Sequence, residues 1–201
     1  MRLVFVKESD LDHMGGAMTT AIFSDGRAMS EEKFLGLGET FERIELFDGS
    51  LLVTPAPTPR HQRISGKLLI ALEPVAERAG LHALEAVNVR LQTDRIPIPD
   101  LVITTKINFD ELVIDAASIR LVCEITSPTS TATDKVLKMH YYATAGIPWY
   151  LLIEQDTGAL RLHELDGATY VERSVTRVGE VLRLTEPVVA TIDPAELLPP
   201  G

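Results

Sequence analysis

The first part of the chain predicts a short helix followed by a β-hairpin. Ser30 precedes two glutamates, a pattern that caps and stabilises the start of a helix, and glycines a few residues later end it. Residues 42–47 and 50–54 read as two strands, because Asp48 and Gly49 form a pair that closes tight hairpins. The prolines that follow end the second strand.

The middle of the chain has the period of a helix and then that of strands. Between residues 60 and 80, apolar side chains recur every three or four positions, and Gly80 is typical of a helix C-terminus. Apolar runs separated by turn residues follow this helix. They predict strands at about residues 81–87, 89–91, 101–104 and 119–125.

The last third predicts one more helix and several further strands. Asp134 caps a helix that runs to about residue 144, where a glycine and a proline stop it. Residues 149–153 form a continuous apolar run, typical of a strand buried on both faces, and turn residues then separate strands up to about residue 192. We therefore predict an α+β (α/β-like) fold, with a mixed central sheet flanked by helices and a C-terminal β-meander.

Length and composition indicate one globular domain. The chain has 201 residues, of which 45% are hydrophobic and 24% charged. We interpret residues 1–28 as an N-terminal extension, partly disordered, with a short strand near its start, and residues 29–201 as a single domain. No apolar run approaches the roughly 20 residues of a membrane helix, and we expect no membrane association.

The cysteine content and the net charge limit the cellular location and the classes of function that fit this sequence. The single cysteine, Cys123, excludes an internal disulfide and favours a reducing, cytoplasmic location. The net charge of −10 argues against a strongly basic, non-specific nucleic-acid binder. It does not exclude a nuclease, because clustered catalytic acids contribute to an acidic total. The sequence has no CxxC, GxGxxG, P-loop or GxSxG motif, and its histidines have no metal-binding spacing.

Two carboxylates stand out because they lie in or beside apolar strands. Asp100 directly precedes the apolar run Leu-Val-Ile at residues 101–103, and Glu124 lies inside the run Leu-Val-Cys-Glu-Ile at residues 121–125. A carboxylate in such a strand costs free energy unless a metal ion, a cation or hydrogen bonds compensate. The alternative is an edge position that faces water. If the two acids lie together, their repulsion should raise the pKa of one of them.

Three other side chains are candidates for a functional site, and each also has an ordinary structural explanation. Lys138 lies one turn into the helix that begins at Asp134, and Tyr141 shares its side, so this face is either a binding surface or solvated. Glu45 alternates with apolar neighbours, which predicts that it is exposed. His61 opens the long helix, where a histidine is usually a capping or surface group.

Three segments in order resemble one family. They are RIELFDGSLLVTPAPTPRHQRI from Arg43, IPIPDLVI from Ile96 and CEITSPTSTATDKVLKMHYYATAGIPWYLLIE from Cys123. Together they resemble the Uma-type family of restriction-endonuclease-like proteins, within the PD-(D/E)xK nuclease superfamily, over most of residues 29–155. The resemblance implies a restriction-endonuclease-like core and Mg²⁺-dependent hydrolysis of DNA, with Mn²⁺ as a substitute. We also expect a homodimer, the commonest soluble oligomer.

The resemblance also implies roles for individual residues. Asp100 matches the aspartate of the motif and Glu124 its second acid, while the superfamily's usual lysine position holds Thr126 and the lysine is displaced to Lys138. Glu45 matches an acid on the first hairpin, where it binds metal through water or orients the lysine. The implied metal ligands are Asp100, Glu124 and the backbone carbonyl of Ile125, and the substrate-binding candidates are Lys135, His61, Ser127 and Tyr141.

Three interpretations remain open from the sequence. The first is an active metal-dependent endonuclease that acts on DNA. The second is a nuclease-fold protein with weak or no catalysis, used for binding or assembly, which the acidic charge favours. The third is an unrelated α/β domain, such as a small metal-dependent hydrolase, whose motif match is chance.

Overall fold

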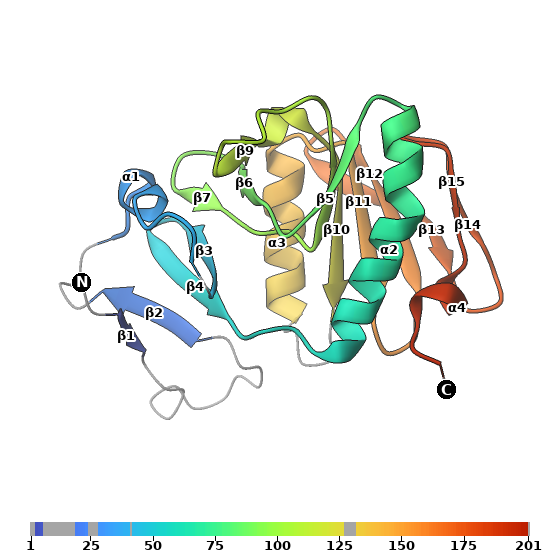
Figure 1. Ribbon diagram of the computed structural model, residues 1–201, viewed down its shortest axis with the longest axis horizontal. Coiled ribbons are helices and arrows are strands. Elements are labelled where there is room, and N and C mark those ends of the chain that lie inside the picture. The colour runs from blue at the N-terminus through green and yellow to red at the C-terminus, as the bar shows by residue number, and fades with distance from the viewer. Residues whose placement is uncertain (1–2, 6–18, 24–27, 41, 127–131, 201) are drawn as a thin grey trace.

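A six-stranded mixed sheet forms the centre of the molecule, and helices cover both of its faces (Figure 1). The structure is a computed structural model that describes residues 3–5, 19–23, 28–40, 42–126 and 132–200. For residues 3–5, 19–23 and 132–135 it describes the backbone path alone. The predicted α+β fold with a mixed central sheet flanked by helices is confirmed.

The central sheet has the strand order β13-β12-β11-β10-β8-β5. Only β10 and β11 are parallel within it, and α3 (Ala132–Thr144) connects them as a crossover. The predicted meander corresponds to β11, β12 and β13, which pair antiparallel in sequence order. The strands are β5 (His82–Glu85), β8 (Leu101–Thr104), β10 (Ile119–Thr126), β11 (Trp149–Glu154), β12 (Leu160–Asp166) and β13 (Thr169–Thr176).

Helix α2 (Pro59–Arg78) covers one face of this sheet. Its buried stripe recurs every four residues at Ile64, Leu68, Leu72 and Ala76, so one side of the helix packs on the sheet. The Thr58 side chain caps the helix by accepting the N–H of His61. The hairpin of β14 (Leu182–Leu184) and β15 (Ala190–Ile192) and the short helix α4 (Pro194–Leu197) pack on the same side.

Helix α3 covers the opposite face. Tyr142 on this helix packs with Val102 and Val122, whereas their strand neighbours face α2. This is the alternation expected of strands buried on both sides. Two short parallel strands, β6 (Asn88–Arg90) and β9 (Val113–Asp115), and the turn η2 (Ala116–Ser118) complete this side.

A second, five-stranded sheet lies beside α3, in the order β1-β2-β4-β3-β7 (Figure 1). The predicted hairpin is confirmed, since Asp48 and Gly49 both have positive φ, 49° and 86°. A Cβ at Gly49 would lie 2.7 Å from the Cβ of Ala28, so the turn requires glycine for space as well as for φ. Around it lie α1 (Glu31–Leu35), β3 (Arg43–Phe47), β4 (Ser50–Thr54) and β7 (Arg95–Ile96).

Part of the predicted N-terminal extension joins this sheet. Strand β2 (Thr19–Phe23) pairs with β4, and β1 (Leu3–Phe5) pairs with β2. The division of the chain at residue 28 stays a prediction.

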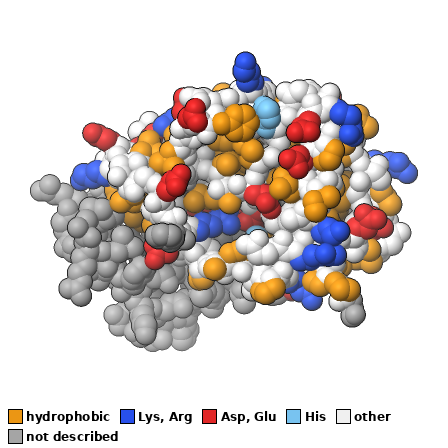
Figure 2. Space-filling model, in the orientation of Figure 1, with side chains coloured by type: hydrophobic (Ala, Val, Ile, Leu, Met, Phe, Trp, Pro, Cys, Tyr) orange, Lys and Arg blue, Asp and Glu red, His pale blue; other side chains and the backbone are white. Residues whose placement is uncertain are grey.

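The distribution of surface charge and the length and hydropathy of the helices bear on which partners the protein can have. Acidic and basic side chains are interspersed over the face shown in Figure 2, with hydrophobic ones between them. Within the described part of the chain, no helix is both long and apolar enough to cross a membrane.

Candidate active site

The sheet register brings Asp100 and Glu124 together. Strands β8 and β10 are antiparallel, and Leu101 lies opposite Cys123. Continuing this register by one residue places Asp100 opposite Glu124, as a cross-strand pair. Both side chains are buried. The two acids that the sequence singled out therefore lie side by side at the end of the sheet.

The Asp100 carboxylate is held by donors from three segments. Its Oδ2 accepts the backbone N–H of Ile125 at 2.8 Å and lies 3.2 Å from His61 Nε2. Its Oδ1 accepts from the guanidinium of Arg43 at 2.8 Å, and Arg43 also donates to the carbonyl of Ile98. Burial alone would raise the pKa of Asp100, but the hydrogen bond with His61 and the charge of Arg43 outweigh it, and the pKa lies well below its usual range.

Glu124 has a different environment. Its Oε1 accepts a hydrogen bond from the hydroxyl of Tyr142 at 2.6 Å and lies 3.6 Å from Lys138 Nζ. Burial raises the pKa of Glu124 to about 7, with a further contribution from Asp100 that the charge of Lys138 partly offsets. The raised pKa predicted for one acid of the pair thus belongs to Glu124. Its leading cause is burial rather than repulsion between the acids.

The predicted exposure of Glu45 is wrong, because its side chain is only 1% exposed. Strand β3 lies inside the second sheet, between β4 and β7, and the polar side of its alternation faces the molecule's interior. Glu45 Oε1 accepts the N–H of Ile98 at 2.8 Å and a hydrogen bond from Lys138 Nζ at 3.0 Å. Lys138 therefore lies between two buried carboxylates that come from different sheets, and not on a solvated face.

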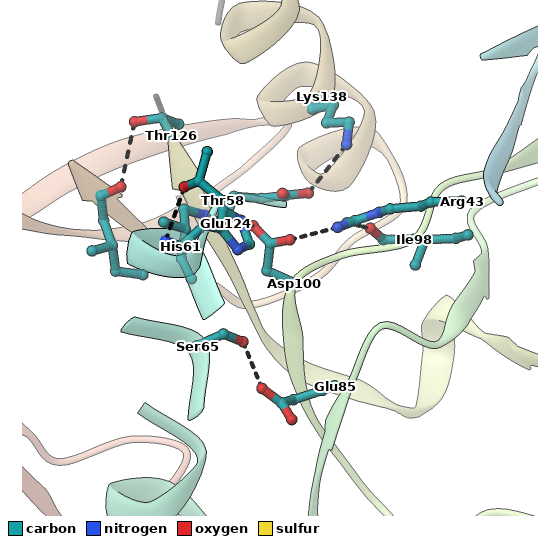
Figure 3. Close-up of polar contacts among 12 residues, drawn as sticks. Arg43, Thr58, His61, Ser65, Glu85, Ile98, Asp100, Glu124, Thr126 and Lys138 are labelled. Carbon is teal, nitrogen blue, oxygen red and sulfur yellow. Dashed lines mark hydrogen bonds and ion pairs between the residues drawn. The ribbon is translucent and has the colours of Figure 1, made fainter. Parts of the chain in front are cut away.

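The predicted substrate-binding residues are spread over several places. His61 is at the centre, with its ring against Asp100 (Figure 3). Tyr141 makes its contacts elsewhere, since its ring packs on Phe47 and Arg95 and its hydroxyl donates to Asp48 at 3.3 Å. Lys135 lies on α3, in the part described by backbone alone, and Ser127 falls outside the described residues. These four assignments stay predictions.

Sequence reasoning missed two members of the cluster. Arg43 lies two residues before Glu45 on β3, so the period of the strand places both on the same side. Tyr142 follows Lys138 by four residues on α3, which places its hydroxyl near the lysine. A correct assignment of the Glu45 and Lys138 faces would have found both.

The donor set suits a hard divalent cation. Asp100 and Glu124 supply carboxylate oxygens at adjacent positions, and Ile125, which follows Glu124, supplies a backbone carbonyl, the ligand types that Mg²⁺ prefers. Among the residues described, no three His, Cys, Asp or Glu side chains are already gathered as a metal site. The acids instead meet the ring of His61 and the cations Arg43 and Lys138, and these two cations offset the charge that a metal ion would offset.

The fold is shared with a solved structure that is described as a nuclease. A solved "putative nuclease belonging to DUF820" from Anabaena variabilis ATCC 29413 superposes with a TM-score of 0.69 at 16% identity, covering 84% of this chain and 97% of that chain. The predicted restriction-endonuclease-like fold is thereby confirmed. A search of curated proteins found no significant match.

Sequence similarity identifies the family. Residues 31–195 match the Uma2 family, described as "Putative restriction endonuclease". The match spans most of the chain, so the protein belongs to this family. Family membership removes the third interpretation, in which the motif match was chance.

Proposed function

We propose that the protein is a divalent-metal-dependent endonuclease that hydrolyses phosphodiester bonds in DNA. The observation that carries this proposal is the pairing of Asp100 with Glu124 at one end of the sheet, with Lys138 between Glu124 and Glu45. Family membership supports the same function. Burying three acids, with a lysine between two of them, costs free energy that stability alone does not explain, which favours a functional role.

Each residue has a task that follows from its surroundings. Asp100, Glu124 and the carbonyl of Ile125 would hold Mg²⁺, with Mn²⁺ as a substitute. The bound ion would polarise the scissile phosphate and lower the pKa of a coordinated water. The Lys138 ammonium stabilises negative charge that develops on the phosphate. Glu45 holds that ammonium in place through its 3.0 Å contact.

The second candidate is a nuclease-fold protein with weak or no catalysis that serves in binding or assembly. The net charge of −10 favours it, as does the interspersed charge on the face in Figure 2. A duplex-binding nuclease ordinarily presents clustered Lys and Arg side chains to the phosphates.

A cleavage assay separates the two candidates. Supercoiled, linear duplex and single-stranded DNA, together with RNA, are incubated with Mg²⁺, with Mn²⁺ and with EDTA. We expect cutting of DNA that requires metal and falls to background in Asp100→Asn. The control variant is Asp110→Asn, which changes an exposed aspartate outside the site. Absence of cutting on every DNA form with both metals rejects the nuclease and leaves the binding or assembly role.

Metal should also stabilise the folded protein. A ligand that binds only the folded state raises the melting temperature, so millimolar Mg²⁺ or Mn²⁺ should raise it above the value in EDTA. Asp100→Asn should abolish this shift while Asp110→Asn keeps it. Identical melting of the unaltered protein with EDTA and with Mn²⁺ contradicts a metal site at these acids.

A cytoplasmic location and a two-fold homodimer are part of the same proposal. The buried free thiol of Cys123 agrees with a reducing compartment. Light scattering behind size exclusion gives the mass in solution, and a mass of one chain at micromolar concentration excludes the dimer.

A further inference from the structure

A cavity of about 560 Å³ adjoins Asp100 at the proposed active site. Its walls come from the end of α1 and the loop after it, from β3, from the first turns of α2 and from the turn between β5 and β6. Arg43, His61 and Asp100 line it, so it is continuous with the proposed active site. Its volume is in the range of about 300–1,000 Å³ that is typical of small-molecule sites.

The charges that line the cavity select against phosphate over most of its length. Glu39, Glu42 and Glu85 line it together with Asp100. Arg43 is the sole Lys or Arg among the described residues that line it. A phosphate is therefore favoured only beside Arg43, next to Asp100. The remainder favours an uncharged or electron-poor group.

Hydrogen-bonding groups in the cavity suit the edge of a base. The Ser65 hydroxyl donates to Glu85 Oε1 at 2.6 Å, and in Figure 3 this pair lies on the side of Asp100 away from Lys138. A glutamate accepts from the exocyclic amine of cytosine, and a glutamine such as Gln62 pairs with adenine. Apolar walls for the ring faces come from Leu37, Ile44 and Leu112. Thymine has no exocyclic amine to offer Glu85.

We propose that this cavity receives an unpaired nucleobase with an exocyclic amine, from the DNA strand that is cut, with the neighbouring phosphate beside Arg43. The inference rests on the proposed nuclease function and names its substrate class. A base inside a duplex is stacked and paired, so it would have to be flipped out before it could enter. The preferred substrates are therefore single strands and duplexes with unpaired nucleotides.

The test measures binding without cleavage. Fluorescent oligo-dC, oligo-dA and oligo-dT of equal length, a duplex of that length and oligo-rC are titrated with the full-length protein in EDTA. We expect oligo-dC and oligo-dA to bind roughly tenfold tighter than oligo-dT, since one specific base contact discriminates by about that factor. They should also bind tighter than the duplex. Binding of oligo-rC tighter than oligo-dC would overturn the assignment to DNA.

Two variants link the preference to the cavity. Glu85→Leu removes the acceptor and should bring oligo-dC down to the affinity of oligo-dT. Leu112→Trp fills the space and should remove the preference for oligo-dC and oligo-dA over oligo-dT. The matched control is Glu77→Gln, which alters an exposed glutamate on α2 outside the cavity and should leave every affinity unchanged.

The outcomes separate this inference from the nuclease itself. Equal affinity for all oligonucleotides, with Glu85→Leu behaving as Glu77→Gln does, overturns the base pocket. If DNA is still cut with metal in that case, the proposed function stands without it. If the oligo-dC preference holds but no DNA form is cut with either metal, the pocket stands and the proposed catalysis fails.

Discussion

Replacing Lys138 with methionine should slow DNA cleavage by roughly a hundredfold or more, because it removes the cation that stabilises charge on the phosphate. Methionine keeps a side chain of similar length in the space between α3 and the two sheets. The substitution also leaves Glu45 and Glu124 buried without that partner, and breaking a buried pair costs about 3–5 kcal/mol. The double variant Lys138→Met, Glu45→Gln removes one of those charges and recovers part of the stability.

The measurement is single-turnover cleavage with saturating Mg²⁺, at a temperature where each variant is folded by its melting curve. Lys135→Ala is the matched control, one turn earlier on the same helix. It should mainly weaken DNA affinity and reduce its salt dependence. An inactive Lys135→Ala beside an active Lys138→Met would show that the lysine was assigned wrongly. Full activity in both would refute the displaced-lysine mechanism.

Elements set by local chemistry were predictable from the sequence. The long helix α2 has a continuous apolar stripe, and the hairpin of β3 and β4 has a turn whose two residues both need positive φ. The short strands β7 and β9 were not predicted. Each has two or three residues and exists because a distant strand offers it hydrogen bonds, which a local pattern does not report.

One predicted strand was too long for a local reason. The sequence indicates a strand over residues 81–87, but β5 ends at Glu85. Ala86 has a φ of 51°, which no strand residue adopts, and it turns the chain toward β6. Alanine gives no sign of this conformation in the sequence, since glycine or asparagine is the usual choice there.

The sequence predicted the site residues that depart from the usual pattern of side chains in a strand, in which acids do not lie within apolar runs. Glu124 stood out as an acid in an apolar strand, and Asp100 as its neighbour in motif order; the sheet register puts them opposite each other. Glu45 does not depart from that pattern. Period-two alternation shows on which side of a strand a residue lies, but not whether another element buries that side. Here α3 covers it through Lys138, and the prediction failed for that reason.

The unusual titration of Glu124 leads to the second large effect, on stability. Its pKa is raised to about 7 in the folded protein, mainly by burial, against 4.5 as its ordinary value. Below pH 4.5 the Glu124 carboxyl is protonated in both the folded and the unfolded state, so its ionisation does not lower the free energy of unfolding. Between pH 4.5 and 7 the unfolded chain ionises first, so the free energy of unfolding falls as the pH rises, by about 3 kcal/mol in total.

Other groups act in separate or opposite ways. The pKa of Asp100 is lowered, so its contribution is present above its ordinary value of 3.8 and is lost only at more acidic pH. Burial lowers the pKa of His163 below 6.5, which destabilises the fold as the pH falls and therefore opposes the effect of Glu124. A comparison of variants at each pH cancels both contributions.

Urea unfolding in EDTA at pH 5, 6, 7 and 8 measures the effect of Glu124. Relative to the unaltered protein, Glu124→Gln should gain stability from pH 5 to about 7 and then keep that gain at pH 8, because its neutral amide is never ionised. The control Glu73→Gln changes an exposed residue of α2 and should run parallel to the unaltered protein. Saturating Mn²⁺ should reverse the order at pH 8, since the cation favours the ionised carboxylate that only the unaltered protein has. If the free energies of unfolding of Glu124→Gln and of the unaltered protein run parallel with pH in EDTA, Glu124 titrates as an ordinary glutamate. The buried acid pair would then have no excess charge for a metal ion to relieve.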